Sequence, residues 1–182
     1  MHCFIHRLPS FLTAKYSLAF LTNFQLGDYL VIRWQGTGGR TVAKTVQHDL
    51  GVVESFAPHI VILQLGTNDL VCLSAVETGS AIEDLTRLLF ESYGVQCICV
   101  CQTIYRENTP SFNTQVNILT QYLKVVLEPI PYVLYWRHRG FWNCKSRFLA
   151  RDGIHLNQLG QYKFFRSLRG AVLRCLRAVA PS

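Results

Sequence analysis

The stretch His59-Ile60-Val61-Ile62-Leu63-Gln64-Leu65-Gly66-Thr67-Asn68-Asp69 joins an apolar segment to a polar turn. The first seven residues are rich in β-branched side chains, which favour a strand in a sheet. Gly66 permits a sharp turn, and the residues after it place polar groups at the end of the strand. In α/β proteins, ligands bind beyond the carboxyl ends of the strands. The stretch therefore predicts a buried strand followed by a functional loop.

The segments on both sides of this stretch alternate between helical and extended patterns. We predict helices at residues 9–21, 41–56, 74–93, 110–127 and 157–179, and strands at 28–34, 59–65, 95–101 and 132–136. Strands that alternate with long helices predict a parallel sheet covered by helices on both faces. A length of 182 residues suits one domain, and 49% apolar content suffices for a sizeable core. We expect a single three-layer α/β domain over residues 1–182.

Two further motifs lie next to predicted ends of elements. Asp152-Gly153-Ile154-His155 precedes the last helix, and an aspartate three residues before a histidine can orient the imidazole as a general base. Gly39 lies in a glycine-rich loop after the strand at 28–34, where its backbone N–H is accessible. With the Asn68 amide it could form an oxyanion hole. Each motif alone also fits an ordinary turn or the start of a surface helix.

In combination and in this order, Gly39, Asn68 and Asp152 with His155 resemble three conserved blocks of the SGNH hydrolases, also called GDSL lipases and esterases. The resemblance covers essentially the whole chain. It looks most like the esterase-like domains in proteins of some animal non-LTR retrotransposons. The resemblance implies a flavodoxin-like α/β fold, hydrolysis of small acyl (acetyl) or lipid esters, and no metal or other cofactor. It assigns Asp152 and His155 to catalysis, and Gly39 and Asn68 to the oxyanion hole.

The nucleophile block departs from the family pattern. The family has a strand, then Gly-x-Ser, then a helix, whereas this chain begins Met1-His2-Cys3 and aligns Cys3 with the serine. A cysteine can attack an ester when a neighbouring base lowers its pKa, so Cys3 is the candidate nucleophile. The alternative is an inert residue near the terminus. The first strand, expected between residues 28–34 and 59–65, is absent, and we therefore expect an N-terminally truncated domain.

The other cysteines and histidines show no spacing typical of a metal site. Three of the seven cysteines lie in Cys97-Ile98-Cys99-Val100-Cys101, where strand alternation puts all three thiols on one face. We interpret them as buried free thiols, which predicts a reducing, cytoplasmic location. The remaining histidines are interpreted as structural or surface residues: His2, His6, His48, His59 and His138.

Positive charge is concentrated near the C-terminus. The chain has a net charge of +7, and residues 137–182 contain ten of its 18 Lys and Arg but one of its 11 acidic residues. Basic residues 137–177 therefore predict contact with RNA or an anionic membrane, unless they form an ordinary solvated surface. No apolar run approaches the roughly 18 residues of a membrane span. Three alternatives stay open: an ester hydrolase, a catalytically inactive RNA- or membrane-associated module, and a fragment with no stable fold.

Overall fold

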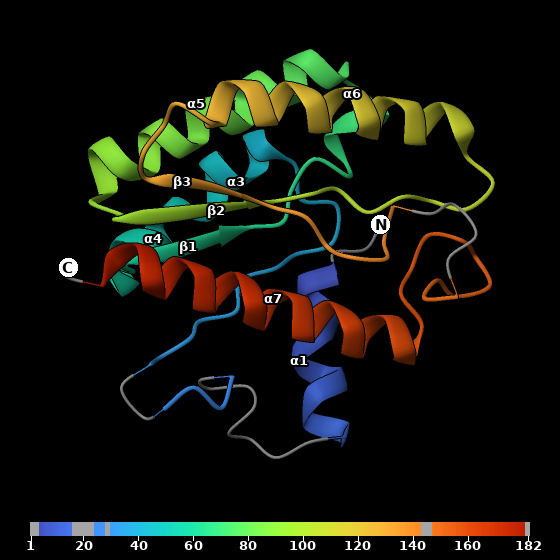
Figure 1. Cartoon of the computed structure of the whole chain (residues 1–182), viewed down its shortest axis with the longest axis horizontal. Helices are drawn as coiled ribbons and strands as arrows, with labels where there is room; N and C mark the ends of the chain where they lie inside the picture. The colour runs from blue at the N-terminus through green and yellow to red at the C-terminus, as the bar shows by residue number, and fades with distance from the viewer. Residues whose placement is uncertain (1–3, 16–23, 28–29, 143–146, 181–182) are drawn as a thin grey trace.

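A computed structural model describes residues 4–15, 24–27, 30–142 and 147–180 of the chain. Within these ranges, three parallel strands form a sheet in the order β1 (Ile60–Leu63), β2 (Cys97–Cys101) and β3 (Val133–Trp136). Helices α5 (Ala75–Tyr93) and α6 (Pro110–Leu127) cover one face of the sheet (Figure 1). Helices α7 (Gln158–Val179) and α1 (Phe4–Lys15) lie on the other. The predicted three-layer parallel α/β fold is confirmed.

Strand β2 is buried on both faces and separates two hydrophobic cores. Its cysteines, Cys97, Cys99 and Cys101, belong to the core beneath α7 and α1. Ile98 and Val100 belong to the core beneath α5 and α6. All three thiols are free and buried, which confirms the prediction that they share one face of a strand.

Local capping residues explain where the long helices begin. Ser74 and Glu77 form a reciprocal capping box at the start of α5. α6 begins at Pro110, whose missing N–H is no loss in the first helical turn. Asn157 caps α7, since its side-chain oxygen accepts the Gly160 N–H at 2.9 Å. These three helices therefore begin within one residue of their predicted positions.

The predicted helix at 41–56 is instead two helices, α3 (Val42–His48) and α4 (Leu50–Phe56). Asp49 separates them with φ −108° and ψ −12°, and it ends one helix as it begins the next. Its largely buried carboxylate pairs with the guanidinium of Arg40, with 2.9 Å between Oδ2 and Nε. The periodicity of the sequence does not show this break, because Arg40 lies outside the helix.

The predicted strand at 28–34 is wrong for its described part, because residues 30–34 belong to no sheet. Their exposure nevertheless alternates. Leu30, Ile32 and Trp34 pack against the core beneath α7, whereas Val31 is 72% exposed. The segment thus has the side-chain period of a strand, although it belongs to no strand of the sheet that the described residues form. Within the described ranges, β1 likewise pairs only with β2. N-terminal truncation stays a prediction.

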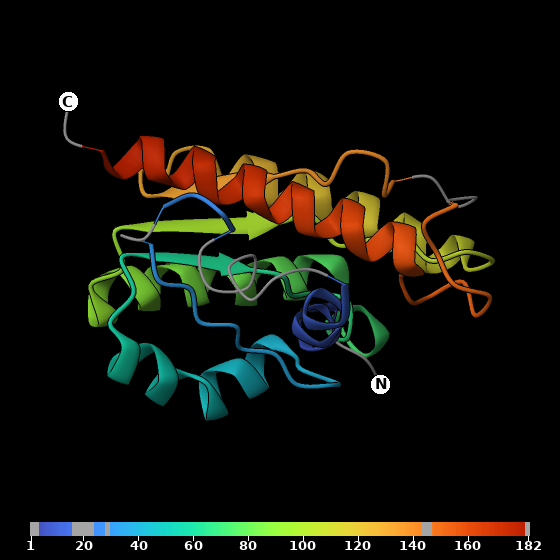
Figure 2. The same cartoon turned by 90° about the horizontal axis from the view of Figure 1, so that it is seen from below.

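The first helix also differs from its predicted bounds of 9–21. α1 begins at Phe4 and contains Pro9, which removes one internal hydrogen bond. Leu8 and Leu12 of this helix are fully buried against α7, and this burial offsets the missing bond. Residues 16–21 lie outside the described residues. Both views place α1 at the end of the sheet toward which the strands point (Figures 1 and 2).

Candidate active site

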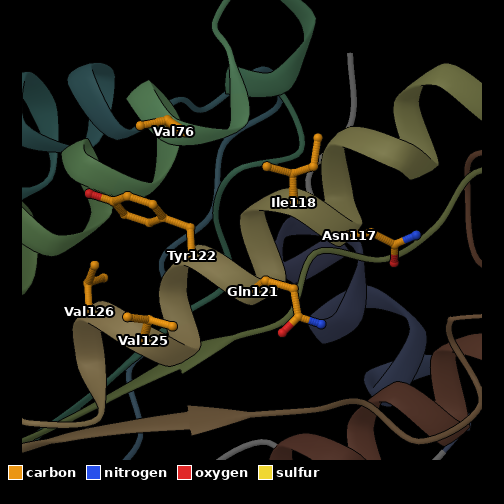
Figure 3. A pocket seen from close by; sticks show the side chains of 7 residues that line it. All are labelled: Val76, Asn117, Ile118, Gln121, Tyr122, Val125 and Val126. Atoms are coloured by element: carbon orange, nitrogen blue, oxygen red, sulfur yellow. The ribbon is translucent and has the colours of Figure 1, made fainter.

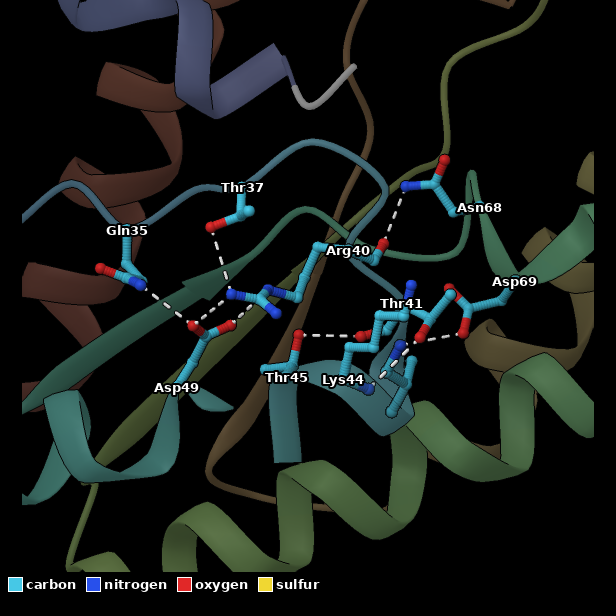
Figure 4. Close-up of polar contacts among 10 residues, drawn as sticks. Gln35, Thr37, Arg40, Thr41, Lys44, Thr45, Asp49, Asn68 and Asp69 are labelled. Atoms are coloured by element: carbon cyan, nitrogen blue, oxygen red, sulfur yellow. Dashed lines mark hydrogen bonds and ion pairs between the residues drawn. The ribbon is translucent and has the colours of Figure 1, made fainter. Parts of the chain in front are cut away.

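The loop after β1 places Asn68 at the carboxyl edge of the sheet. Gly66 turns the chain with φ +95°, and a Cβ at this position would lie 2.9 Å from Thr103 Oγ1, so no other residue fits without strain. Asn68 Nδ2 donates a hydrogen bond to the Arg40 carbonyl at 2.8 Å (Figure 4). Since an amide has two N–H groups, one stays without an acceptor among the described residues.

The glycine-rich loop carries Gly39 to the same place. Gly39 is buried and has φ +74°, and the next residue, Arg40, provides the carbonyl that Asn68 contacts. Arg40 Nη2 donates to Asp49 Oδ1 at 3.0 Å, and Gln35 Nε2 donates to the same oxygen at 2.9 Å (Figure 4). These bonds anchor the loop to the junction of α3 and α4. The structure therefore brings together Gly39 and Asn68, the two predicted oxyanion-hole residues.

Asp69 connects the loop after β1 to the start of α3 through a hydrogen bond. Its side chain is 2% exposed, and its Oδ1 accepts the backbone N–H of Val42, the first residue of α3, at 2.9 Å. Burial raises the pKa of Asp69, and its backbone hydrogen bonds oppose that rise. The carboxyl group thus connects the loop after β1 to a helix N-terminus, where negative charge is favoured.

The Asp152 carboxylate holds the His155 ring in a defined orientation. One oxygen, Oδ1, accepts the backbone N–H groups of Ile154 and His155, each at 2.9 Å. The other, Oδ2, contacts His155 Nδ1. The hydrogen bond from His155, followed by the two backbone N–H groups, holds the pKa of Asp152 well below its ordinary range. A charged Asp152 favours a proton on Nδ1, which leaves Nε2 able to act as a base.

A small hairpin before α7 carries this pair. Leu149 and Leu156 form an antiparallel bridge, and the Ala150 N–H donates to the His155 carbonyl at 2.7 Å. Asn157 Nδ2 donates to the Leu149 carbonyl at 2.9 Å, while its Oδ1 caps the helix. One asparagine therefore fixes the hairpin and the start of α7 as a unit.

Residues 102–109, which follow β2, connect the two halves of the site. Arg106 Nη2 donates to the Thr67 carbonyl at 3.1 Å, next to Asn68. The Glu107 N–H donates to the Gly153 carbonyl at 2.7 Å, between Asp152 and His155. Sequence reasoning did not single out Arg106 or Glu107. Their position after a predicted strand, at the same edge of the sheet, is the signal that would have found them.

The candidate nucleophile Cys3 lies outside the described residues, as does Cys144. The buried Cys97 is a poor nucleophile, since a hydrogen bond with Cys175 and burial raise the pKa of its thiol far above the ordinary value. Cys72 is exposed. Where the chain is described, no three His, Cys, Asp or Glu side chains are grouped so that they could hold a metal ion.

His138 is a structural residue rather than a site residue, as interpreted from the sequence. Its ring is fully buried, with Gln64 Oε1 2.7 Å from Nε2 and Ser167 Oγ 2.8 Å from Nδ1. Burial lowers its pKa to about 3. A neutral ring that donates to Gln64 and accepts from Ser167 satisfies all these groups.

An apolar pocket lies between α5 and α6, on the side of these helices away from the sheet (Figure 3). None of the candidate site residues lines it. The lining residues are Val76, Asn117, Ile118, Gln121, Tyr122, Val125 and Val126. Among the described helices, none is long and apolar enough to cross a membrane.

No family model matches the chain, and no curated protein matches it. Solved structures do share its fold. An acetylxylan esterase from Geobacillus stearothermophilus is 17% identical, with TM-score 0.67, and the match covers 100% of this chain and 82% of that one. An acetyl esterase variant solved with an acetate ion is 14% identical, with TM-score 0.69 and coverages of 97% and 90%. A carbohydrate esterase of family 3 from Talaromyces cellulolyticus is 17% identical, with TM-score 0.63 and coverages of 98% and 93%. At these identities the likeness shows the fold alone.

Proposed function

We propose that this chain hydrolyses carboxylic esters that carry a small acyl group such as acetyl, or a lipid acyl chain. The observation that carries the proposal is the Asp152–His155 pair at one edge of the sheet. Hydrogen bonds of residues 102–109 link this pair to the loops that contain Gly39 and Asn68. Acyl transfer requires a base oriented by a carboxylate and N–H donors for the oxyanion, and Gly39 and Asn68 are the candidate donors. The likeness to esterase structures gives further support.

In the proposed reaction, His155 Nε2 takes the proton of the Cys3 thiol, and the thiolate attacks the ester carbonyl carbon. The Gly39 N–H and the second Asn68 N–H donate to the oxyanion that forms, and the Cys3 N–H is a third donor. When the oxyanion collapses, the C–O bond breaks and the alcohol leaves with the proton from His155. Water, deprotonated by His155, then hydrolyses the thioester. Asp152 stays charged throughout and positions the imidazole.

Steady-state hydrolysis of 4-nitrophenyl acetate tests this function. We expect His155→Ala to lower kcat at least about 100-fold, since it removes the general base, and Cys3→Ala to abolish His155-dependent turnover. The exposed residues His59 and Cys72 offer matched controls, and their alanine variants should keep the wild-type rate. Wild-type turnover no faster than that of His155→Ala would contradict the proposal.

A second candidate is an RNA- or membrane-associated module that uses basic residues 137–177. Arg166, Arg174 and Arg177 are exposed on α7, and none forms an ion pair with a described residue. We expect glutamate at these three positions to abolish any binding to single-stranded RNA or phosphatidylserine vesicles, and binding to weaken steeply with salt. A binding affinity that changes neither with salt concentration nor with charge reversal would contradict this candidate. Descent from a retrotransposon protein and the cellular compartment stay predictions.

A further inference from the structure

The guanidinium of Arg106 is held beside the candidate oxyanion hole by groups that do not neutralise it. Its Nη2 donates to the Thr67 carbonyl at 3.1 Å, and its Cζ lies 3.9 Å from the centre of the Phe112 ring. Both contacts fix the plane of the group. Neither supplies a negative charge.

The backbone of Arg106 is fixed as firmly as its side chain. Asn113, which is 7% exposed, accepts the Arg106 N–H at 2.9 Å and donates to the Arg106 carbonyl at 2.7 Å. A buried asparagine that bonds both backbone groups of one residue holds that residue in a single position. The guanidinium is therefore a rigid part of the edge rather than a mobile surface group.

No carboxylate balances this charge within the part of the chain that the structure describes. Arg106 forms no ion pair there, and its buried Nε has no hydrogen-bond partner. Asp152 bonds His155 and Asp69 Oδ1 accepts the Val42 N–H, and neither carboxylate forms an ion pair with Arg106. Burial also lowers the pKa of Arg106. An uncompensated, half-buried charge costs free energy, and a bound anion would recover part of it.

We infer that Arg106 binds a negatively charged group of the substrate, so that the preferred substrates are esters bearing a carboxylate or phosphate near the scissile bond. This inference rests on the proposed ester hydrolysis. Planar guanidinium groups bind such anions through paired N–H donors, and Arg106 uses one N–H on Thr67. The neighbouring Glu107 N–H is bonded to Gly153, which places Arg106 between Asn68 and the hairpin of His155.

The test compares each anionic ester with its uncharged methyl ester. In the first pair the anionic member is 4-acetoxybenzoate, which carries its charge on the alcohol side of the ester. In the second pair it is monophenyl succinate, which carries its charge on the acyl side. We expect kcat/KM to favour the anionic member of at least one pair, and Arg106→Gln to reduce that preference about tenfold. Arg106→Lys should retain part of it. Arg33→Gln, at an exposed arginine outside the candidate site and outside basic residues 137–177, removes the same charge and should leave the preference unchanged.

Calorimetric binding of the same esters to His155→Ala, with and without Arg106→Gln, separates this inference from the proposed function. If wild-type turnover equals that of His155→Ala, ester hydrolysis fails, while tighter binding of the anionic ester that requires Arg106 still supports the inference. An anionic preference that is absent, or that persists in Arg106→Gln, overturns it. Equal losses for both members of a pair overturn it too, since they indicate a purely structural role.

Discussion

At the scale of single residues, backbone groups fix the candidate catalytic side chains. Asp152 accepts two backbone N–H groups, and Asn68 donates to a backbone carbonyl. Because the fold sets the backbone, these orientations exist before a substrate arrives, which is the preorganisation that acyl transfer needs. The sequence predicts Asp152 with His155, Asn68 and Gly39 because each lies in a short motif that resembles a block of the SGNH hydrolases. It does not predict the role of Arg106, whose contact with Thr67 joins residues 39 positions apart.

His138 predicts a specific pH dependence of stability. The unfolded chain binds a proton at this residue near pH 6.5, whereas the folded chain keeps the ring neutral down to about pH 3. Falling pH therefore favours the unfolded state over this interval. From pH 7 to pH 5 we expect His138 to remove about 2 kcal/mol from the free energy of unfolding. Urea unfolding at both pH values measures this loss.

His138→Gln should reduce the pH dependence by that amount, because glutamine does not titrate. His59→Gln alters an exposed histidine and should behave as the wild type. The depressed pKa of Asp152 acts only below the ordinary pKa of an aspartate, so Asp152 contributes little between pH 7 and pH 5. Equal pH dependence in the wild type and His138→Gln would show that the buried ring is not held neutral.

At the scale of elements, the sequence predicts best where a local signal marks a boundary. α6 has its predicted bounds, since Pro110 starts it, and α5 ends at Gly94, which has φ +65°. The prediction of an element fails where contacts with residues outside that element determine its bounds or its pairing. Asp49 divides one predicted helix because Arg40 takes its carboxylate. Residues 30–34 keep the alternation of a strand, yet they belong to no strand of the sheet that the described residues form.

The junction between the hairpin and α7 gives a prediction at this scale. A Cβ at Gly160 would lie 2.1 Å from the Phe148 carbonyl oxygen, and a backbone atom cannot rotate away. We expect Gly160→Ala to lower the free energy of unfolding by about 2 kcal/mol. It should also reduce ester hydrolysis, because the hairpin carries His155. Thermal melts and the 4-nitrophenyl acetate assay measure the two effects.

Gly51 offers the matched control. It lies in α4 with nothing within 4 Å of its would-be Cβ, and alanine there should stabilise the chain by about 0.5–1 kcal/mol through helix propensity. If Gly160→Ala is as stable and active as Gly51→Ala, then the close packing of α7 on residue 148 does not hold the hairpin.

At the scale of the whole molecule, one sheet divides two cores and presents three loops at its carboxyl edge (Figures 1 and 2). The alternation of strands and helices predicts this arrangement, and therefore predicts that Gly39, Asn68 and the 152–155 motif approach one another. The sequence does not show which hydrogen bonds connect these loops. They are donated by Arg106 to the Thr67 carbonyl and by Glu107 to the Gly153 carbonyl. The same edge combines the candidate site residues with the guanidinium of Arg106, which forms no ion pair among the described residues.

The central proposal is a base–nucleophile relay from His155 to Cys3, and peptide mass spectrometry tests it directly. The chain is mixed with 4-nitrophenyl acetate, quenched within one turnover and digested. We predict an acetyl group on Cys3 of the wild type and none on Cys3 of His155→Ala, with the exposed Cys72 labelled equally in both as background. Cys3 acetylation that is unchanged in His155→Ala, or no greater than that of Cys72, would contradict the proposed mechanism.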